Sequence, residues 1–176
     1  MSYPTSGTYQ RQYPRLEVLR GFNPNEPFTL SQAYPVKSGV TILSGQVISP
    51  EWQSATEDYQ WVLGVASQGV APFIALNDSA DYDVVSAGNL NGLSCAGQFE
   101  VQIPFYKTAD AANLVNGVAI AADGTTGNIK VAGTSDVVIG NITRNHGPLD
   151  ITGTNSSAST KLVVSFTTGF SGVVHA

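Results

Sequence analysis

Short apolar runs separated by turn residues fill the chain after Pro35. Residues 99–103 alternate apolar and polar side chains, which is typical of a strand with one buried face. Helical signals are few, with single turns expected at 54–59 and 110–114. Further strands are expected at residues 40–43, 46–49, 59–63, 70–76, 137–139, 150–152 and 161–166. The pattern predicts a mainly β fold, a compact β-sandwich or a barrel-like body.

The first 35 residues read differently from the rest. They hold five of the nine prolines and four of the seven tyrosines, without a sustained period. Proline fixes φ, removes a donor and pushes the preceding residue toward extended geometry. Residues 1–35 are therefore predicted to form an extended N-terminal arm, and residues 36–176 a β-rich body. The arm carries too many apolar side chains for an inert tail, so we expect it to order against a partner.

A weak internal duplication runs through the predicted body. Residues 38–42 resemble residues 116–120, and each copy is followed by a turn and by an apolar run that ends in glycine. Two copies are too few for a solenoid. The duplication suggests two similar β-modules, at 36–76 and 114–168.

The charge of the chain argues against direct binding of nucleic acid. The formal net charge is −5 and the pI is near 4.7, whereas a nucleic-acid binder needs a dominant basic face. Charge is uneven, because the first 37 residues carry +2 and the rest −7. Either the arm is aimed at an acidic partner or it is a solvated tail, and charge alone leaves both open.

No secretion signal or membrane span is evident in the sequence. The N-terminus lacks a basic segment followed by an apolar one, and no apolar run approaches the length that spans a bilayer. Cys95 is the only cysteine, so an intramolecular disulfide is impossible. We expect synthesis in a host cytoplasm and no membrane contact.

Candidate catalytic and metal-binding groups are sparse. His146 lies in a turn signature and His175 is the penultimate residue, so neither has the frame of a catalytic base or a zinc site. Glu51 and Glu57 remain a conceivable acid–base pair. Residues 123–127 resemble a phosphate loop but lack its Gly-Lys-Ser/Thr ending, which favours a turn between strands. We expect no enzyme activity, no cofactor and no metal.

An acidic segment spans residues 77–83. Its carboxylates, Asp78, Asp81 and Asp83, stand at near-alternate positions, but the distal glutamate of an EF-hand is missing. A loop whose carboxylates cap backbone amides is the favoured interpretation, and cation binding remains the alternative.

Trp52, Tyr59 and Trp61 form the main aromatic group of the predicted body. In a β-protein such residues most often anchor a core or an interface. A platform on which a sugar ring stacks is the alternative.

Several stretches resemble the decoration (cement) proteins of tailed-phage capsids. They are residues 34–49, 61–66, 81–88, 92–100 and 144–150, and the resemblance extends over about residues 34–170. It implies a structural virion protein on the capsid exterior that stabilises contacts between subunits of the major capsid protein. It also implies a homo-oligomer, most often a trimer.

The resemblance further implies that an extended N-terminal segment docks on the shell. The residues expected to make this contact are Tyr9, Arg11, Tyr13, Arg15, Leu16, Leu19, Arg20, Phe22 and Phe28. A receptor- or glycan-binding module of a tail fibre or spike is the alternative function, since it would share the β-rich, weakly acidic composition.

Overall fold

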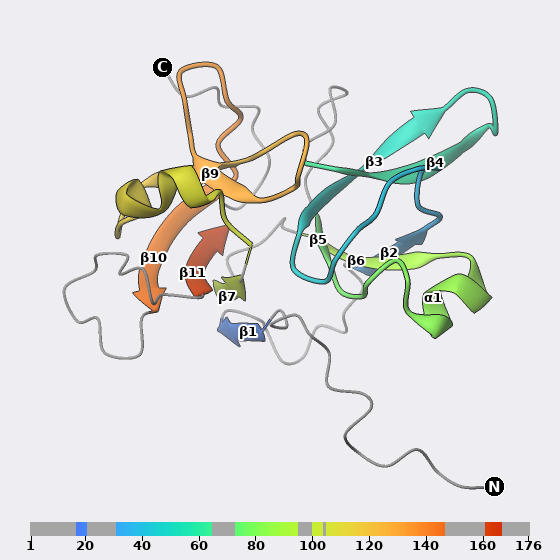
Figure 1. Ribbon diagram of the computed structural model, residues 1–176, viewed down its shortest axis with the longest axis horizontal. Helices are drawn as coiled ribbons and strands as arrows, with labels where there is room; N and C mark the ends of the chain where they lie inside the picture. Colours follow the sequence, from blue (N-terminus) through green and yellow to red (C-terminus); the bar gives the residue numbers. More distant parts are fainter. Residues whose placement is uncertain are drawn as a thin grey trace, which may run out of the picture.

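The computed structural model describes residues 17–20, 31–64, 73–94, 100–103, 105–146 and 161–166. These residues form two antiparallel sheets with one short α-helix and one 3-10 helix (Figure 1). The predicted mainly β fold is confirmed. Neither sheet closes into a barrel, so of the two predicted architectures the barrel-like one is wrong.

The first sheet is built from residues 31–94. Its strands lie in the order β2-β6-β5-β3-β4, and every neighbouring pair is antiparallel. Their bounds are β2 (Ser31–Tyr34), β3 (Val47–Gln53), β4 (Asp58–Leu63), β5 (Phe73–Ala75) and β6 (Leu90–Ser94).

The second sheet takes one strand from the N-terminal segment and five from the later half of the chain. Its order is β1-β7-β11-β10-β8-β9, again antiparallel throughout. The bounds are β1 (Glu17–Arg20), β7 (Glu100–Ile103), β8 (Ala119–Ala122), β9 (Ile129–Val131), β10 (Gly140–His146) and β11 (Lys161–Phe166).

The first sheet is buried on both faces, because successive side chains of its strands enter different core clusters. Val47 and Ile74 pack with Ile120 and other residues of the second sheet. Their neighbour Ile48 packs in another cluster on the opposite face. This alternation follows from the period of two in a strand. The first sheet is therefore the middle layer, with the second sheet on one face.

Helix α1 (Tyr82–Ala87) lies on the other face of the first sheet. Its Val84 is buried in the same cluster as Ile48, and Gly88 ends the helix with φ +73°. The sequence pattern did not predict this helix, since six residues with one buried side chain leave no periodic stripe. The 3-10 helix η1 (Thr108–Asn113) overlaps the turn expected at 110–114. The turn expected at 54–59 is instead the β3–β4 connection and the start of β4.

The strands expected at 46–49, 59–63, 99–103 and 161–166 match β3, β4, β7 and β11. Part of 70–76 is β5, while 65–72 and 147–160 lie outside the described residues. No strand covers 40–43. There the Ile42 amide donates to Ser79 Oγ at 3.0 Å and the Leu43 amide to Gln46 Oε1 at 2.7 Å, so side chains take the place of a neighbouring strand. Residues 137–139 form only the approach to β10.

Pro50 lies inside β3 rather than ending it, opposite Trp61. The Trp61 amide donates to the Pro35 carbonyl at 2.8 Å, and the Trp61 carbonyl accepts from the Lys37 amide at 3.1 Å. These two Trp61 groups thus point away from β3. The missing donor of Pro50 consequently removes no hydrogen bond between β3 and β4.

Two segments of the predicted arm are strands of the body. β1 is an edge strand of the second sheet and β2 an edge strand of the first. Residues 1–16 and 21–30 lie outside the described residues. The boundary predicted at residue 35 therefore falls after two strands that belong to the sheets of the body.

The duplicated segments share a turn geometry. Val40 donates its amide to the Lys37 carbonyl at 3.0 Å, and Val118 to the Val115 carbonyl at 3.1 Å. The third residue of each turn is a glycine with φ near +80°, a conformation that disfavours other residues. After the turns the two copies diverge, because residues 119–122 form β8 and residues 40–43 form no strand.

Candidate functional surfaces

Aromatic side chains on the β3–β4 hairpin form a ladder from the surface into the core. Trp52 pairs with Tyr59 across the hairpin, and their ring centroids lie 5.2 Å apart. Tyr34 of β2 contacts Tyr59 at 5.9 Å and Trp61 at 5.0 Å. Trp52, Tyr59 and Trp61 share one face, because the register pairs Trp61 with Pro50, two residues before Trp52.

The inner end of the ladder belongs to the core. Trp61 is fully buried, and its indole N–H donates to the Leu90 carbonyl at 2.7 Å. Trp52 and Tyr59, at the outer end, remain exposed. The prediction that these aromatics anchor a core is confirmed for Trp61, whereas Trp52 and Tyr59 keep part of their surface exposed.

Glu51 is engaged in an ion pair beside the hairpin. Its Oε1 lies 2.8 Å from Lys37 Nζ and also accepts from the Gln53 side chain at 2.8 Å. The Lys37 hydrogen bond, with help from Gln53, holds the pKa of Glu51 below its ordinary value. A general acid at neutral pH requires the opposite shift. Glu57 is an exposed turn residue with φ +53°.

Carboxylates of the acidic segment cap backbone amides. Asp78 Oδ1 accepts from the Ser44 amide at 2.6 Å, and Asp81 Oδ2 from the Asp78 amide at 3.3 Å. This confirms the predicted capping role for these two residues. Within the part of the chain that the structure describes, no group of three or more His, Cys, Asp or Glu side chains is placed to hold a metal ion.

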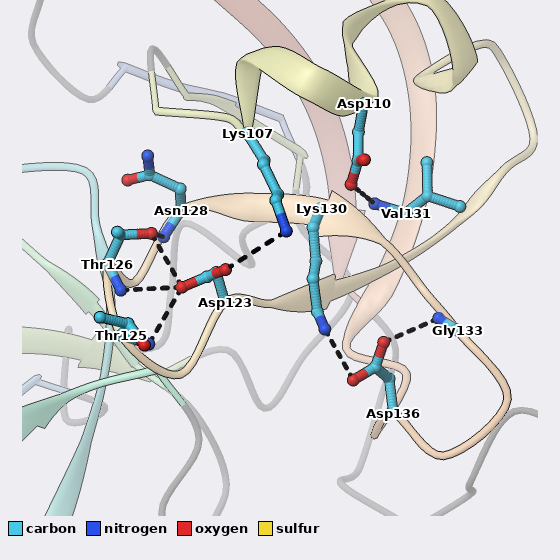
Figure 2. A network of polar contacts seen from close by, with 10 residues as sticks. All are labelled: Lys107, Asp110, Asp123, Thr125, Thr126, Asn128, Lys130, Val131, Gly133 and Asp136. Carbon is cyan, nitrogen blue, oxygen red and sulfur yellow. Dashed lines mark hydrogen bonds and ion pairs between the residues drawn. The ribbon is translucent and has the colours of Figure 1, made fainter.

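Residues 123–127 form the turn between β8 and β9, as the sequence predicted. Figure 2 shows Asp123 at its centre, with Oδ1 accepting from the Thr125 amide at 3.0 Å and the Thr126 amide at 2.9 Å. The Thr126 amide is the main cause of a lowered pKa at Asp123, and Lys107, 3.8 Å away, adds to it. The amides that would cradle a phosphate are thus occupied by a carboxylate.

The same turn joins the two sheets. Gln46, which is buried beside β3, donates from Nε2 to the Thr126 carbonyl at 2.8 Å. The Val47 amide donates to the Gly127 carbonyl at 2.8 Å. Gly127 has φ +65°, and a Cβ there would lie 2.6 Å from the Val47 carbonyl oxygen. The close contact between the sheets therefore depends on a glycine at this position.

A second group of polar contacts lies at β9 and the turn that follows it. Lys130 Nζ lies 2.8 Å from Asp136 Oδ1, and Asp136 Oδ2 accepts from the Gly133 amide at 2.7 Å (Figure 2). The Lys130 contact is the main cause of a lowered pKa at Asp136. Asp110 accepts from the Val131 amide at 3.1 Å. These contacts assign the three residues structural roles.

Of the nine arm residues predicted to contact a partner, the structure describes Leu19 and Arg20. Both lie in β1, where Arg20 stands opposite Glu100 of β7. The other predicted contact residues lie outside the described ranges, and so does His175. His146, expected in a turn, is instead the last residue of β10. From the sequence, residues 17–20 were expected only as part of the extended arm, without an indication that they pair with a strand of the body.

Comparison with protein-family models and with curated proteins finds no significant match to this chain. Among the described residues, no helix combines the length and apolar character needed to cross a bilayer.

Proposed function

We propose that this chain is a structural virion protein that binds the outer surface of a tailed-phage capsid and stabilises contacts between major capsid subunits. It would act without a catalytic centre and as a homo-oligomer, and a trimer is the favoured oligomer. The observation that carries the proposal is the placement of β1 and β2 at the edges of the two sheets. The proline-rich N-terminal segment is thereby anchored at both sheets.

The segment that precedes β1 suits a docking role. Tyr9, Arg11, Tyr13 and Arg15 occupy alternate positions. In an extended chain they would share one side, where tyrosine supplies apolar area and arginine supplies charge-assisted hydrogen bonds to carboxylates. Backbone pairing with a strand of the shell would add hydrogen bonds of the kind seen in strand addition.

Docking has to overcome the entropy lost on ordering the arm. Fixing each backbone residue costs about 1–2 kcal/mol. Burial of aromatic side chains offsets this cost, and anchoring at β1 lowers it because the segment is already tethered to the body. The arm would therefore lose most of its affinity when its tyrosines and arginines are removed.

Binding to purified capsids that lack this protein tests the proposal. The full chain should co-sediment with them, and a variant with serine at Tyr9, Arg11, Tyr13 and Arg15 should bind more than about tenfold more weakly. This variant keeps β1 and β2, unlike a truncation of the whole predicted arm.

The same segment offers a matched control. Alanine at Ser6 and serine at Thr8, Gln10 and Gln12, which are polar residues at even-numbered positions of this segment, should leave capsid binding unchanged. Equal binding by both variants would show that the arm is not the docking element. Absence of binding by the full chain to any assembled shell would overturn the proposed function itself.

A further inference from the structure

The first sheet and its connections carry the whole net charge of the protein. Residues 31–94 contain one basic residue, Lys37, against six acidic ones, which gives −5, the same as the formal charge of the full chain. The acidic residues are Glu51, Glu57, Asp58, Asp78, Asp81 and Asp83. Lys37 is already paired with Glu51. The remaining carboxylates create a negative field on this half of the protein.

The large exposed apolar side chains lie on the same half, on two of its elements. Among the residues whose burial the structure describes, they are Trp52 at 43%, Tyr59 at 42%, Tyr82 at 83% and Val85 at 67% relative exposure. Trp52 and Tyr59 lie on the β3–β4 hairpin, and Tyr82 and Val85 on α1. Exposed aromatic groups of this kind are typical of binding surfaces.

The hairpin rings and α1 belong to one side of the first sheet. Trp52 and Tyr59 follow the strand face of Ile48 and Trp61, and α1 packs on that face through Val84. The second sheet covers the opposite face through Val47 and Ile74. Figure 1 accordingly shows the hairpin and α1 at the end of the molecule away from β9, β10 and β11.

We propose that this side of the first sheet, with Trp52, Tyr59 and Glu57 on the hairpin and Tyr82 and Asp83 on α1, binds an arginine-bearing extended segment of a partner protein that spans the two elements. Charge complementarity selects a basic occupant. The guanidinium group fits both features of the surface, since it stacks on aromatic rings and pairs with carboxylates. The inference is independent of the capsid proposal, because it concerns the first sheet and not the N-terminal arm.

Calorimetric titration of the full chain with a peptide of repeated Arg-Gly-Pro units tests this surface. The peptide should bind, and binding should weaken several-fold between about 0.05 and about 0.3 M salt as the charges are screened. Replacing arginine by citrulline, which is uncharged, should abolish binding. Replacing it by lysine should weaken binding, because the planar stacking group is lost.

Protein variants locate the site. Tyr82→Ala should weaken binding about tenfold or more without a loss of stability, because this ring is largely exposed. Trp52→Ala should act in the same direction, with circular dichroism to verify the hairpin. Removing two charges by Glu57→Gln and Asp83→Asn should also weaken binding. Asp110→Asn, which removes a charge from the other half and keeps an acceptor for Val131, is the matched control and should bind normally.

Three results would overturn the inference. The first is peptide binding that Tyr82→Ala, Trp52→Ala and the charge variants leave unchanged. The second is tighter binding of a peptide with the sequence of residues 1–16, which would make a second copy of this chain the occupant. The third is binding of a neutral oligosaccharide that Trp52→Ala abolishes while the arginine peptide does not bind.

Discussion

Gly92 of β6 lies directly against the buried ring of Trp61. A Cβ at Gly92 would stand 2.9 Å from two ring carbons of Trp61 and 3.2 Å from Phe73 Cβ. No side chain fits this space unless the tryptophan shifts. Because Trp61 also contacts Tyr34 and Phe73, the glycine sets the position of the whole aromatic ladder.

Gly92→Ala should therefore destabilise the protein by about 1–3 kcal/mol, the usual cost of overpacking a core. Chemical denaturation followed by circular dichroism measures the change. Gly124→Ala is the control, since a Cβ there has no neighbour within 4 Å. A Gly92→Ala protein as stable as the parent would mean that the ring can shift freely.

Trp61→Phe should lower the free energy of unfolding by about 1–3 kcal/mol through loss of the indole hydrogen bond alone. The substitution removes the indole donor that satisfies the Leu90 carbonyl at 2.7 Å, and it also leaves a small cavity. Thermal unfolding provides the measurement. Trp52→Phe, at the exposed end of the ladder, should change stability by less than about 0.5 kcal/mol.

Gln46→Ala should weaken the junction between the sheets by about 1–3 kcal/mol, since it strips partners from the Leu43 amide and the Thr126 carbonyl. Gln60→Ala is the matched comparison, because the Gln60 amide group donates to Thr56 Oγ1 and Asp58 Oδ1, both within the β3–β4 hairpin. Hydrogen exchange of the Val47 amide, which donates to Gly127, should accelerate in Gln46→Ala alone. Similar exchange rates in both variants would argue against a junction at this turn.

Stability should fall as the solution is acidified. Hydrogen bonds and lysines lower the folded-state pKa of Asp123, Asp136 and Glu51. A carboxyl with a lowered folded pKa contributes stability that is complete above its unfolded pKa, about 3.9 for Asp and about 4.3 for Glu. That contribution is lost as pH falls through the folded pKa.

Asp123→Asn tests the contribution of the carboxylate at the β8–β9 turn. At pH 7 the variant should be less stable than the parent, and the gap should narrow as pH falls below about 4. Denaturation curves across this range give the comparison. A gap that stays constant with pH would show that the charge of Asp123 does not contribute.

The sequence predicted the strands whose side chains alternate or form β-branched runs, such as β4, β7 and β11. It did not predict β10, because Gly140–His146 is mostly polar and is held as a strand by pairing with β11 and β8. Helix α1 was missed for lack of an apolar stripe.

Long-range contacts were beyond the sequence pattern for a physical reason. Gln46 and Thr126 are 80 residues apart, and their contact depends on how the two sheets pack. The Asp-Gly-Thr-Thr-Gly string at residues 123–127 predicted a turn, but it did not indicate that this turn lies at the junction between the sheets. The exposed aromatic surface likewise required the register that pairs Trp52 with Tyr59.

Electron cryomicroscopy of virions, with and without the gene for this chain, tests the proposed function most directly. The account predicts added density of a two-sheet protein on the outer face of the capsid shell, bridging neighbouring major capsid subunits, which disappears when the gene is deleted. Density confined to the tail or its fibres, or unchanged shells in the two preparations, would contradict it.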